Sequence, residues 1–206
     1  MSSKVKICGL RRPRDIEMAN LYKPDYVGFV FAESSRQVTE EEAEALKAEL
    51  ADGILAVGVF VNAPVVQAAR IAEKGIIDMI QLHGDEDEAY ICSLKKLTGR
   101  PVIKAVRVQS REQILQAEKL PCDHLLLDTY TKGQYGGSGK RFDLSLIPGL
   151  SKPFFLAGGL NAENVRQALE ISGAFAADVS SAVETDGYKD TDKVKAFIQA
   201  VREEKR

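Results

Sequence analysis

The 206-residue sequence has no tryptophan and only three cysteines, Cys8, Cys92 and Cys122. An odd number of cysteines at irregular spacing predicts neither a disulfide framework nor a zinc site, which fits a reducing cytosol. The charge is almost balanced, because 28 lysines and arginines stand against 30 aspartates and glutamates. The chain therefore lacks the basic excess on which nucleic-acid binding relies.

Long apolar runs are also missing. The longest, such as residues 54–61, are far shorter than the roughly 20 residues that a membrane-spanning helix needs. The first residues lead directly into a strand-like segment, without the apolar stretch and cleavage site of a secretory signal. We therefore expect a cytoplasmic protein that binds neither membranes nor nucleic acid.

Short runs rich in Val, Ile, Leu and Phe alternate with amphipathic, charged stretches along the whole chain. The apolar runs begin near Lys4, Asp25, Ile54, Ile77, Pro101, Asp123, Pro153 and Ala174. The helix-like stretches span 13–22, 39–51, 64–74, 86–97, 110–119, 143–147, 161–171 and 190–204. Eight such units in 206 residues give about 26 residues each, close to the minimum for a strand, a helix and two loops. The repeat predicts an α/β fold with one domain over residues 1–206, a closed TIM (β/α)8 barrel.

A doubly wound open sheet is the alternative with the same alternation. Its usual glycine-rich fingerprint after the first strand is missing, because Leu10, Arg11 and Arg12 follow Cys8 and Gly9. We therefore favour the closed barrel.

Local signals refine this plan. Thr39 followed by Glu42 predicts a capping box, and Asn161 predicts the start of the seventh helix. The segment 129–141 contains four glycines and is a candidate mobile lid.

The loops after predicted strands seven and eight carry a candidate phosphate site. Barrels of this kind place the active site at the carboxyl ends of the strands and often bind phosphate there. Gly158 and Gly159 allow close approach of the backbone, and Ser180 and Ser181 add hydroxyl donors. A double glycine alone is equally explained by a tight turn, so the neighbouring serines decide in favour of phosphate.

Cys8 ends the first predicted strand. An isolated cysteine on an apolar strand is usually a small buried hydrophobe. Strand alternation, however, directs Lys6 and Cys8 into the barrel, where an ammonium favours the proton-abstracting thiolate. Asp178 has the same orientation on the eighth strand, beside the first, and we hypothesise that it pairs with Lys6.

Asp128 and His83 also stand at predicted strand ends. A carboxyl group that emerges from the apolar run before Asp128 suits a general acid, and a loop cap is its alternative role. His83 is equally compatible with a substrate contact and with a structural role. The acidic run 85–88 indicates a solvated helix N-terminus rather than a metal site.

The order and spacing of six segments closely resemble the phosphoribosylanthranilate isomerase family of tryptophan biosynthesis. The segments are KICGL at 6–10, QLHG at 81–84, LD at 127–128, GGSG with FD at 136–143, LAGGLN at 156–161 and DVSS at 178–181. The resemblance spans the chain. It implies a single-domain barrel that converts N-(5-phosphoribosyl)anthranilate into 1-(2-carboxyphenylamino)-1-deoxyribulose 5-phosphate, an Amadori rearrangement without metal or cofactor.

The resemblance also implies residue roles. Asp128 would protonate the ribose ring oxygen as general acid, and Cys8 would remove the proton from C2′ as general base. Arg36 would bind the anthranilate carboxylate, a role suited to a guanidinium, although a solvated loop arginine is its plain alternative. We expect the remaining substrate-binding residues to be His83, Gly158, Gly159, Ser180 and Ser181.

The sequence departs from the family pattern at Arg11, Ser35, Ala176, Ala177 and Ala182. The methyl group of Ala182 predicts weaker substrate affinity if this backbone contacts phosphate. A metal-dependent epimerase is disfavoured, because the chain has only two histidines. A non-catalytic or differently specific sugar-phosphate-binding barrel stays open as the alternative. We expect a small-molecule substrate and a monomer, with a homodimer as the other possibility.

Overall fold

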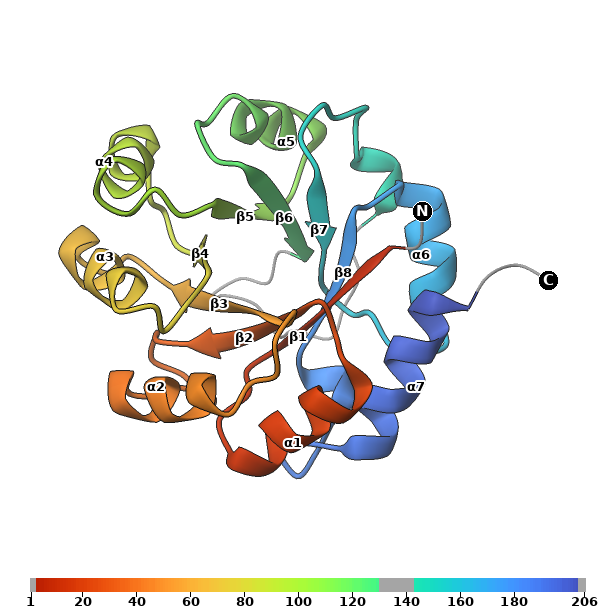
Figure 1. Cartoon of the computed structure of the whole chain (residues 1–206). Helices are drawn as coiled ribbons and strands as arrows, with labels where there is room; N and C mark the ends of the chain where they lie inside the picture. Colours follow the sequence, from red (N-terminus) through yellow and green to blue (C-terminus); the bar gives the residue numbers. More distant parts are fainter. Residues whose placement is uncertain (1–2, 130–142, 204–206) are drawn as a thin grey trace.

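The computed structural model describes residues 3–129 and 143–203 and contains a closed barrel of eight parallel strands (Figure 1). The strands are β1 (Lys4–Cys8), β2 (Tyr26–Val30), β3 (Leu55–Phe60), β4 (Met79–Leu82), β5 (Val102–Val108), β6 (His124–Thr129), β7 (Phe154–Leu156) and β8 (Ala176–Val179). Each strand pairs with the next, and β8 pairs with β1 to close the ring. The predicted barrel is confirmed, and the open sheet is excluded.

Seven α-helices occur in the described part of the chain and surround the barrel (Figure 1). They are α1 (Pro13–Tyr22), α2 (Glu40–Ala48), α3 (Val65–Glu73), α4 (Glu88–Thr98), α5 (Arg111–Glu118), α6 (Val165–Ser172) and α7 (Thr191–Arg202). The helix predicted over 143–147 is instead the short 3-10 helix η1 (Leu144–Leu146). Its few residues cannot form the repeated hydrogen bonds that make an α-helix cooperative.

Two small elements follow β8. The 3-10 helix η2 (Ser181–Val183) leads into an antiparallel hairpin of β9 (Glu184–Thr185) and β10 (Tyr188–Lys189). The sequence analysis did not predict this hairpin, because strands of two residues have no detectable period.

Alternation along the strands separates two layers of the core. Val5 and Ile7 are buried in the apolar layer between barrel and helices, whereas Lys6 is fully buried inside the barrel. A second apolar cluster, which includes Tyr26 and Phe155, fills the interior with an edge-to-face ring contact at 5.3 Å. The polar residues at the carboxyl ends of the strands lie next to this inner apolar layer.

Lys6 and Asp178 form a buried ion pair inside this barrel. Their Cα atoms are register partners on β1 and β8, and the Nζ to Oδ1 distance is 2.9 Å. The hypothesised pairing of Lys6 with Asp178 is therefore confirmed. It satisfies a lysine that would otherwise be costly to bury.

The helix starts were predicted with mixed success. Thr39 accepts a hydrogen bond from the Glu42 backbone N–H, and the Glu42 side chain accepts one from the Thr39 N–H, which confirms the capping box. Helix α6 begins at Val165, later than predicted, but Asn161 makes the hydrogen bonds expected of a cap. The Asn161 side chain accepts hydrogen bonds one turn earlier, from the backbone of Glu163 and Asn164.

Two further features concern the outline of the chain. Within residues 3–129 and 143–203, no helix has both the length and the apolar character required to cross a bilayer. Apart from Thr129, the predicted lid at 129–141 lies outside the described residues, as does the GGSG segment.

Candidate active site

A cavity of about 610 Å³ lies at the carboxyl ends of the strands. This volume is in the range of sites that enclose small metabolites. Its lining includes all eight residues predicted from the sequence: Cys8, Arg36, His83, Asp128, Gly158, Gly159, Ser180 and Ser181. The fold thus brings residues from five strand ends and from the loop after β2 to one place.

Cys8 is the last residue of β1 and is 8% exposed. A glycine on the neighbouring strand makes room for it, because a Cβ added to Gly28 would lie 2.7 Å from the Cys8 sulfur. Burial raises the pKa of the Cys8 thiol, and the nearby Lys6 ammonium lowers it only in part. The net direction is opposite to the thiolate-favouring effect expected from Lys6 alone, because desolvation is the larger influence.

Asp128 is near the end of β6 and contacts His83 from the end of β4. The Asp128 Oδ1 atom accepts a hydrogen bond of 2.7 Å from the Thr129 backbone N–H. The His83 Nε2 atom lies 3.3 Å from Asp128 Oδ2, and its Nδ1 atom lies 2.8 Å from the Gln81 amide nitrogen. With Gln81 donating to Nδ1, a ring proton of His83 lies on Nε2, which makes no hydrogen bond within the described residues.

Gly158 follows β7 and touches this carboxyl group. Its φ is +84°, and a Cβ there would lie 2.9 Å from Asp128 Oδ1 and 2.7 Å from the Thr129 backbone nitrogen. Glycine is therefore required by the packing around Asp128, in addition to the predicted approach of an anion. No described residue accepts a hydrogen bond from the backbone N–H of Gly158 or Gly159.

Ser180 and Ser181 follow β8. The Ser180 hydroxyl donates a hydrogen bond of 2.9 Å to the backbone carbonyl of Cys8, so it ties the end of β8 to the end of β1. Ser181 is the first residue of η2. The cradle of Gly158, Gly159 and Ser181 lies next to the thiol and the carboxyl group that line the same cavity.

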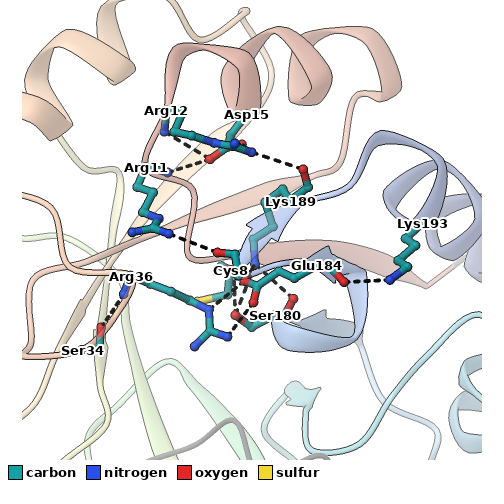
Figure 2. Close-up of polar contacts among 11 residues, drawn as sticks. Cys8, Arg11, Arg12, Asp15, Ser34, Arg36, Ser180, Glu184, Lys189 and Lys193 are labelled. Carbon is teal, nitrogen blue, oxygen red and sulfur yellow. Dashed lines mark hydrogen bonds and ion pairs between the residues drawn. The ribbon is translucent and has the colours of Figure 1, made fainter.

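Arg36 lines the cavity and forms a two-point ion pair with Glu184 of β9 (Figure 2). Lys189 of β10 donates to the same carboxylate over 2.6 Å. Burial alone would raise the pKa of Glu184, but hydrogen bonds from Arg36 and Lys189 bring it down to about 2. Arg36 is thus not the solvated loop arginine of the alternative interpretation.

The acidic run at 85–88 differs in part from its prediction. Asp87 caps α4 by accepting a hydrogen bond from the Tyr90 backbone, as a helix N-terminus would suggest. Glu86, however, is buried and pairs with Lys104 over 2.8 Å. It also accepts hydrogen bonds from the backbone of Asn62 and Gly84, so it holds the loop after His83 rather than facing water.

The sequence analysis missed Gly28, Glu184 and Lys189. The two charged residues lie in the unpredicted hairpin, and the contact of Glu184 with Arg36 spans 148 positions of the chain. Gly28 carried a weak signal, since a glycine inside a strand often marks a close approach of neighbouring atoms.

Comparison with known proteins identifies the family. The model of the N-(5′-phosphoribosyl)anthranilate isomerase family matches residues 5–200. An N-(5′-phosphoribosyl)anthranilate isomerase from Lachnoclostridium phytofermentans is 50% identical, with 96% of each chain covered. The crystal structure of phosphoribosyl anthranilate isomerase from Thermotoga maritima has a TM-score of 0.86 at 34% identity, covering 97% of this chain and 98% of that one.

A second solved phosphoribosyl anthranilate isomerase is described in complex with reduced 1-(o-carboxyphenylamino)-1-deoxyribulose 5-phosphate. It has a TM-score of 0.83 at 33% identity, and the match covers 97% of this chain and 98% of that one. The chain therefore belongs to the N-(5′-phosphoribosyl)anthranilate isomerase family.

Proposed function

We propose that the chain isomerises N-(5′-phosphoribosyl)anthranilate in tryptophan biosynthesis, with Asp128 as general acid and Cys8 as general base. The observation that carries these roles is the lining of one cavity by a carboxyl group, a thiol and a glycine-serine cradle. Two successive proton transfers require one group that acts as an acid and another that acts as a base, each in a different environment.

The first step opens the ribose ring. Asp128, in its protonated form, donates a proton to the ring oxygen while the bond from that oxygen to C1′ breaks, and the anthranilate nitrogen supplies electrons to form a Schiff base. The contact of 3.3 Å between His83 and Asp128 supports His83 as the group that orients the carboxyl.

The second step moves a proton from C2′. The Cys8 thiolate takes this proton, and the electron pair of the C–H bond forms the enolamine and neutralises the iminium nitrogen. In the tautomerisation of the enolamine, the C2′ hydroxyl loses its proton and a proton adds at C1′, which gives the ketose. Neither step needs an oxidant, because the rearrangement is internal to the substrate.

We assign separate binding roles to two groups of residues that line the cavity. We assign the phosphate to Gly158, Gly159, Ser180 and Ser181, whose backbone N–H groups, together with the Ser181 hydroxyl, suit an anion. We assign the anthranilate carboxylate to Arg36, whose planar guanidinium matches a carboxylate. Holding the aromatic and phosphate groups in this way would place C1′ and C2′ near Asp128 and Cys8, which line the same cavity.

The fluorescence of N-(5′-phosphoribosyl)anthranilate provides the test. We expect the purified protein to remove this fluorescence catalytically, at the same rate with and without a chelator. Saturable binding of the substrate without turnover would instead favour a non-catalytic binding barrel. A rate that disappears with the chelator would contradict the proposed acid–base chemistry.

We also propose that the enzyme is cytoplasmic and monomeric, with a homodimer as the alternative. Light scattering coupled to size-exclusion chromatography distinguishes the two states, because their masses differ twofold.

A further inference from the structure

The Arg36–Glu184 pair has a defined geometry in which only one edge of the guanidinium is used (Figure 2). Arg36 Nε donates to Glu184 Oε1, and Arg36 Nη2 donates to Oε2, both over 2.7 Å. A guanidinium has five N–H donors, so this contact leaves Nη1 and the second hydrogen of Nη2. No described residue accepts a hydrogen bond from Nη1 of Arg36.

We propose that Glu184 is a positioning residue that holds this second edge of Arg36 toward the aromatic carboxylate of the substrate, and so selects a carboxylated aryl amine. The inference rests on the proposed function, and it assigns to Glu184 an indirect role through Arg36. Two parallel hydrogen bonds fix both the position and the plane of a guanidinium, whereas a single contact leaves it free to rotate.

The stem of Arg36 is also confined. It crosses Gly9, where a Cβ would lie 2.5 Å from Arg36 Cδ, and Gly9 has a φ of +86°. The absence of a side chain at this position lets the arginine lie flat over the turn after β1. Arg36 is thus held by backbone at its stem and by Glu184 at one edge.

Glu184 itself is held by neighbours that do not line the cavity. The Lys189 ammonium is 1% exposed and lies 2.6 Å from Glu184 Oε1, and it also donates to the Ser180 carbonyl over 3.0 Å. Lys193 of α7 donates to the Glu184 backbone carbonyl over 2.8 Å. The hairpin of β9 and β10 therefore contacts both Arg36 and Ser180, two residues that line the cavity.

Charge supports the same assignment. Arg36 and Lys189 contribute two positive charges and Glu184 one negative charge, which leaves one positive charge beside the cavity. With a pKa of about 2, Glu184 keeps its charge at neutral pH. The net positive charge favours the binding of one further carboxylate. Because Arg36 is already held in place, little conformational entropy is lost when the substrate binds.

The experiment compares two substrates that differ only in the carboxylate, N-(5′-phosphoribosyl)anthranilate and N-(5′-phosphoribosyl)aniline. For each, kcat and KM are measured by chromatography of the ketose product. We expect the wild-type protein to prefer the carboxylated substrate, and we expect Glu184→Gln to reduce this preference about tenfold, chiefly through a higher KM. Arg36→Met should remove most of the preference, because it removes the group that Glu184 positions.

Glu40→Gln is the matched control. Glu40 also accepts from an arginine and a lysine, Arg70 and Lys74, each over 2.6 Å, but it lies on the outer helices. This variant should leave the preference unchanged. Glu184→Asp provides a second test that retains the charge beside Lys189 while shortening the reach to Arg36, and we expect it to lose preference as well.

The outcomes separate the inference from the proposed function. If Glu184→Gln and Glu184→Asp slow both substrates by the same factor, Glu184 has only a structural role and the inference is overturned, while the isomerase assignment stands. A wild-type protein without preference for the carboxylate overturns it too. A wild-type protein that does not convert N-(5′-phosphoribosyl)anthranilate contradicts the proposed function itself.

Discussion

At the scale of single residues, position along the strands predicted which residues line the site. The buried environment of these residues changed the interpretation of their chemistry. Cys8, His83 and Asp128 line the cavity because they stand at or directly after strand ends. The direction of the Cys8 pKa could not be predicted from its neighbour Lys6, because desolvation depends on how deeply the folded chain buries the thiol. Glu184 could not be predicted either, since only the folded hairpin brings it to Arg36.

The raised pKa of Cys8 predicts a pH dependence of the reaction. The base must be a thiolate, and burial raises the Cys8 pKa above its ordinary value of 9.0. Between about pH 7 and pH 9, each unit of pH therefore increases the thiolate fraction about tenfold. The wild-type reaction also uses the proton of Asp128, so the thiolate is best followed in Asp128→Asn, which has no carboxyl group at this position. We expect log kcat/KM of Asp128→Asn for N-(5′-phosphoribosyl)anthranilate to rise with pH over this interval, with a slope near one.

Steady-state rates at fixed low substrate concentration measure this slope. Asp128→Asn combined with Cys92→Ala is the control and should show the same rise, because Cys92 lies on α4, outside the cavity lining. A profile that is flat from pH 7 to pH 9 would argue against Cys8 as the base that limits kcat/KM.

At the scale of elements, long amphipathic stretches were predictable and short ones were not. Each strand of the barrel and seven of the eight predicted helices have counterparts in the described chain. A period of 2 or 3.6 residues can be recognised only over several turns or pleats. The 3-10 form of η1 and the hairpin of β9 and β10 could therefore not be predicted. At the junction of β1 and β8, the strand register places Lys6 opposite Asp178, and the two side chains form a buried ion pair.

This junction makes a prediction about stability. Lys6→Met would leave the Asp178 carboxylate without its ammonium partner in the barrel interior. We expect the free energy of unfolding to fall by about 3–5 kcal/mol, the usual cost of an unpaired buried charge. Urea denaturation at neutral pH measures the difference.

Lys4→Met on the same strand is the control for this change. Lys4 pairs with Asp25 over a similar distance of 2.8 Å, but its side chain is 49% exposed. An exposed pair contributes about 0–1 kcal/mol, so the loss should be small. Equal losses in the two variants would show that burial does not determine the strength of the Lys6–Asp178 pair.

At the scale of the whole molecule, barrel closure explains how residues distant in sequence share one site. Cys8 and Ser180 are 172 positions apart, yet their strands are neighbours and a hydrogen bond of 2.9 Å joins them. The described chain has the architecture that its isomerase relatives share over nearly their full length. The repeat in the sequence predicted this architecture, because eight strand–helix units of minimal length have few other ways to bury all their apolar faces.

The central claim is that Cys8 and Asp128 divide the two proton transfers between them. The most direct measurement is kcat/KM for N-(5′-phosphoribosyl)anthranilate in Cys8→Ala and Asp128→Asn, with circular dichroism to verify the fold and Cys92→Ala as the matched thiol control. We predict that each of the first two variants loses activity by about 10²–10⁴-fold, whereas Cys92→Ala stays near the wild-type value. Comparable activity in all three folded variants would contradict the account.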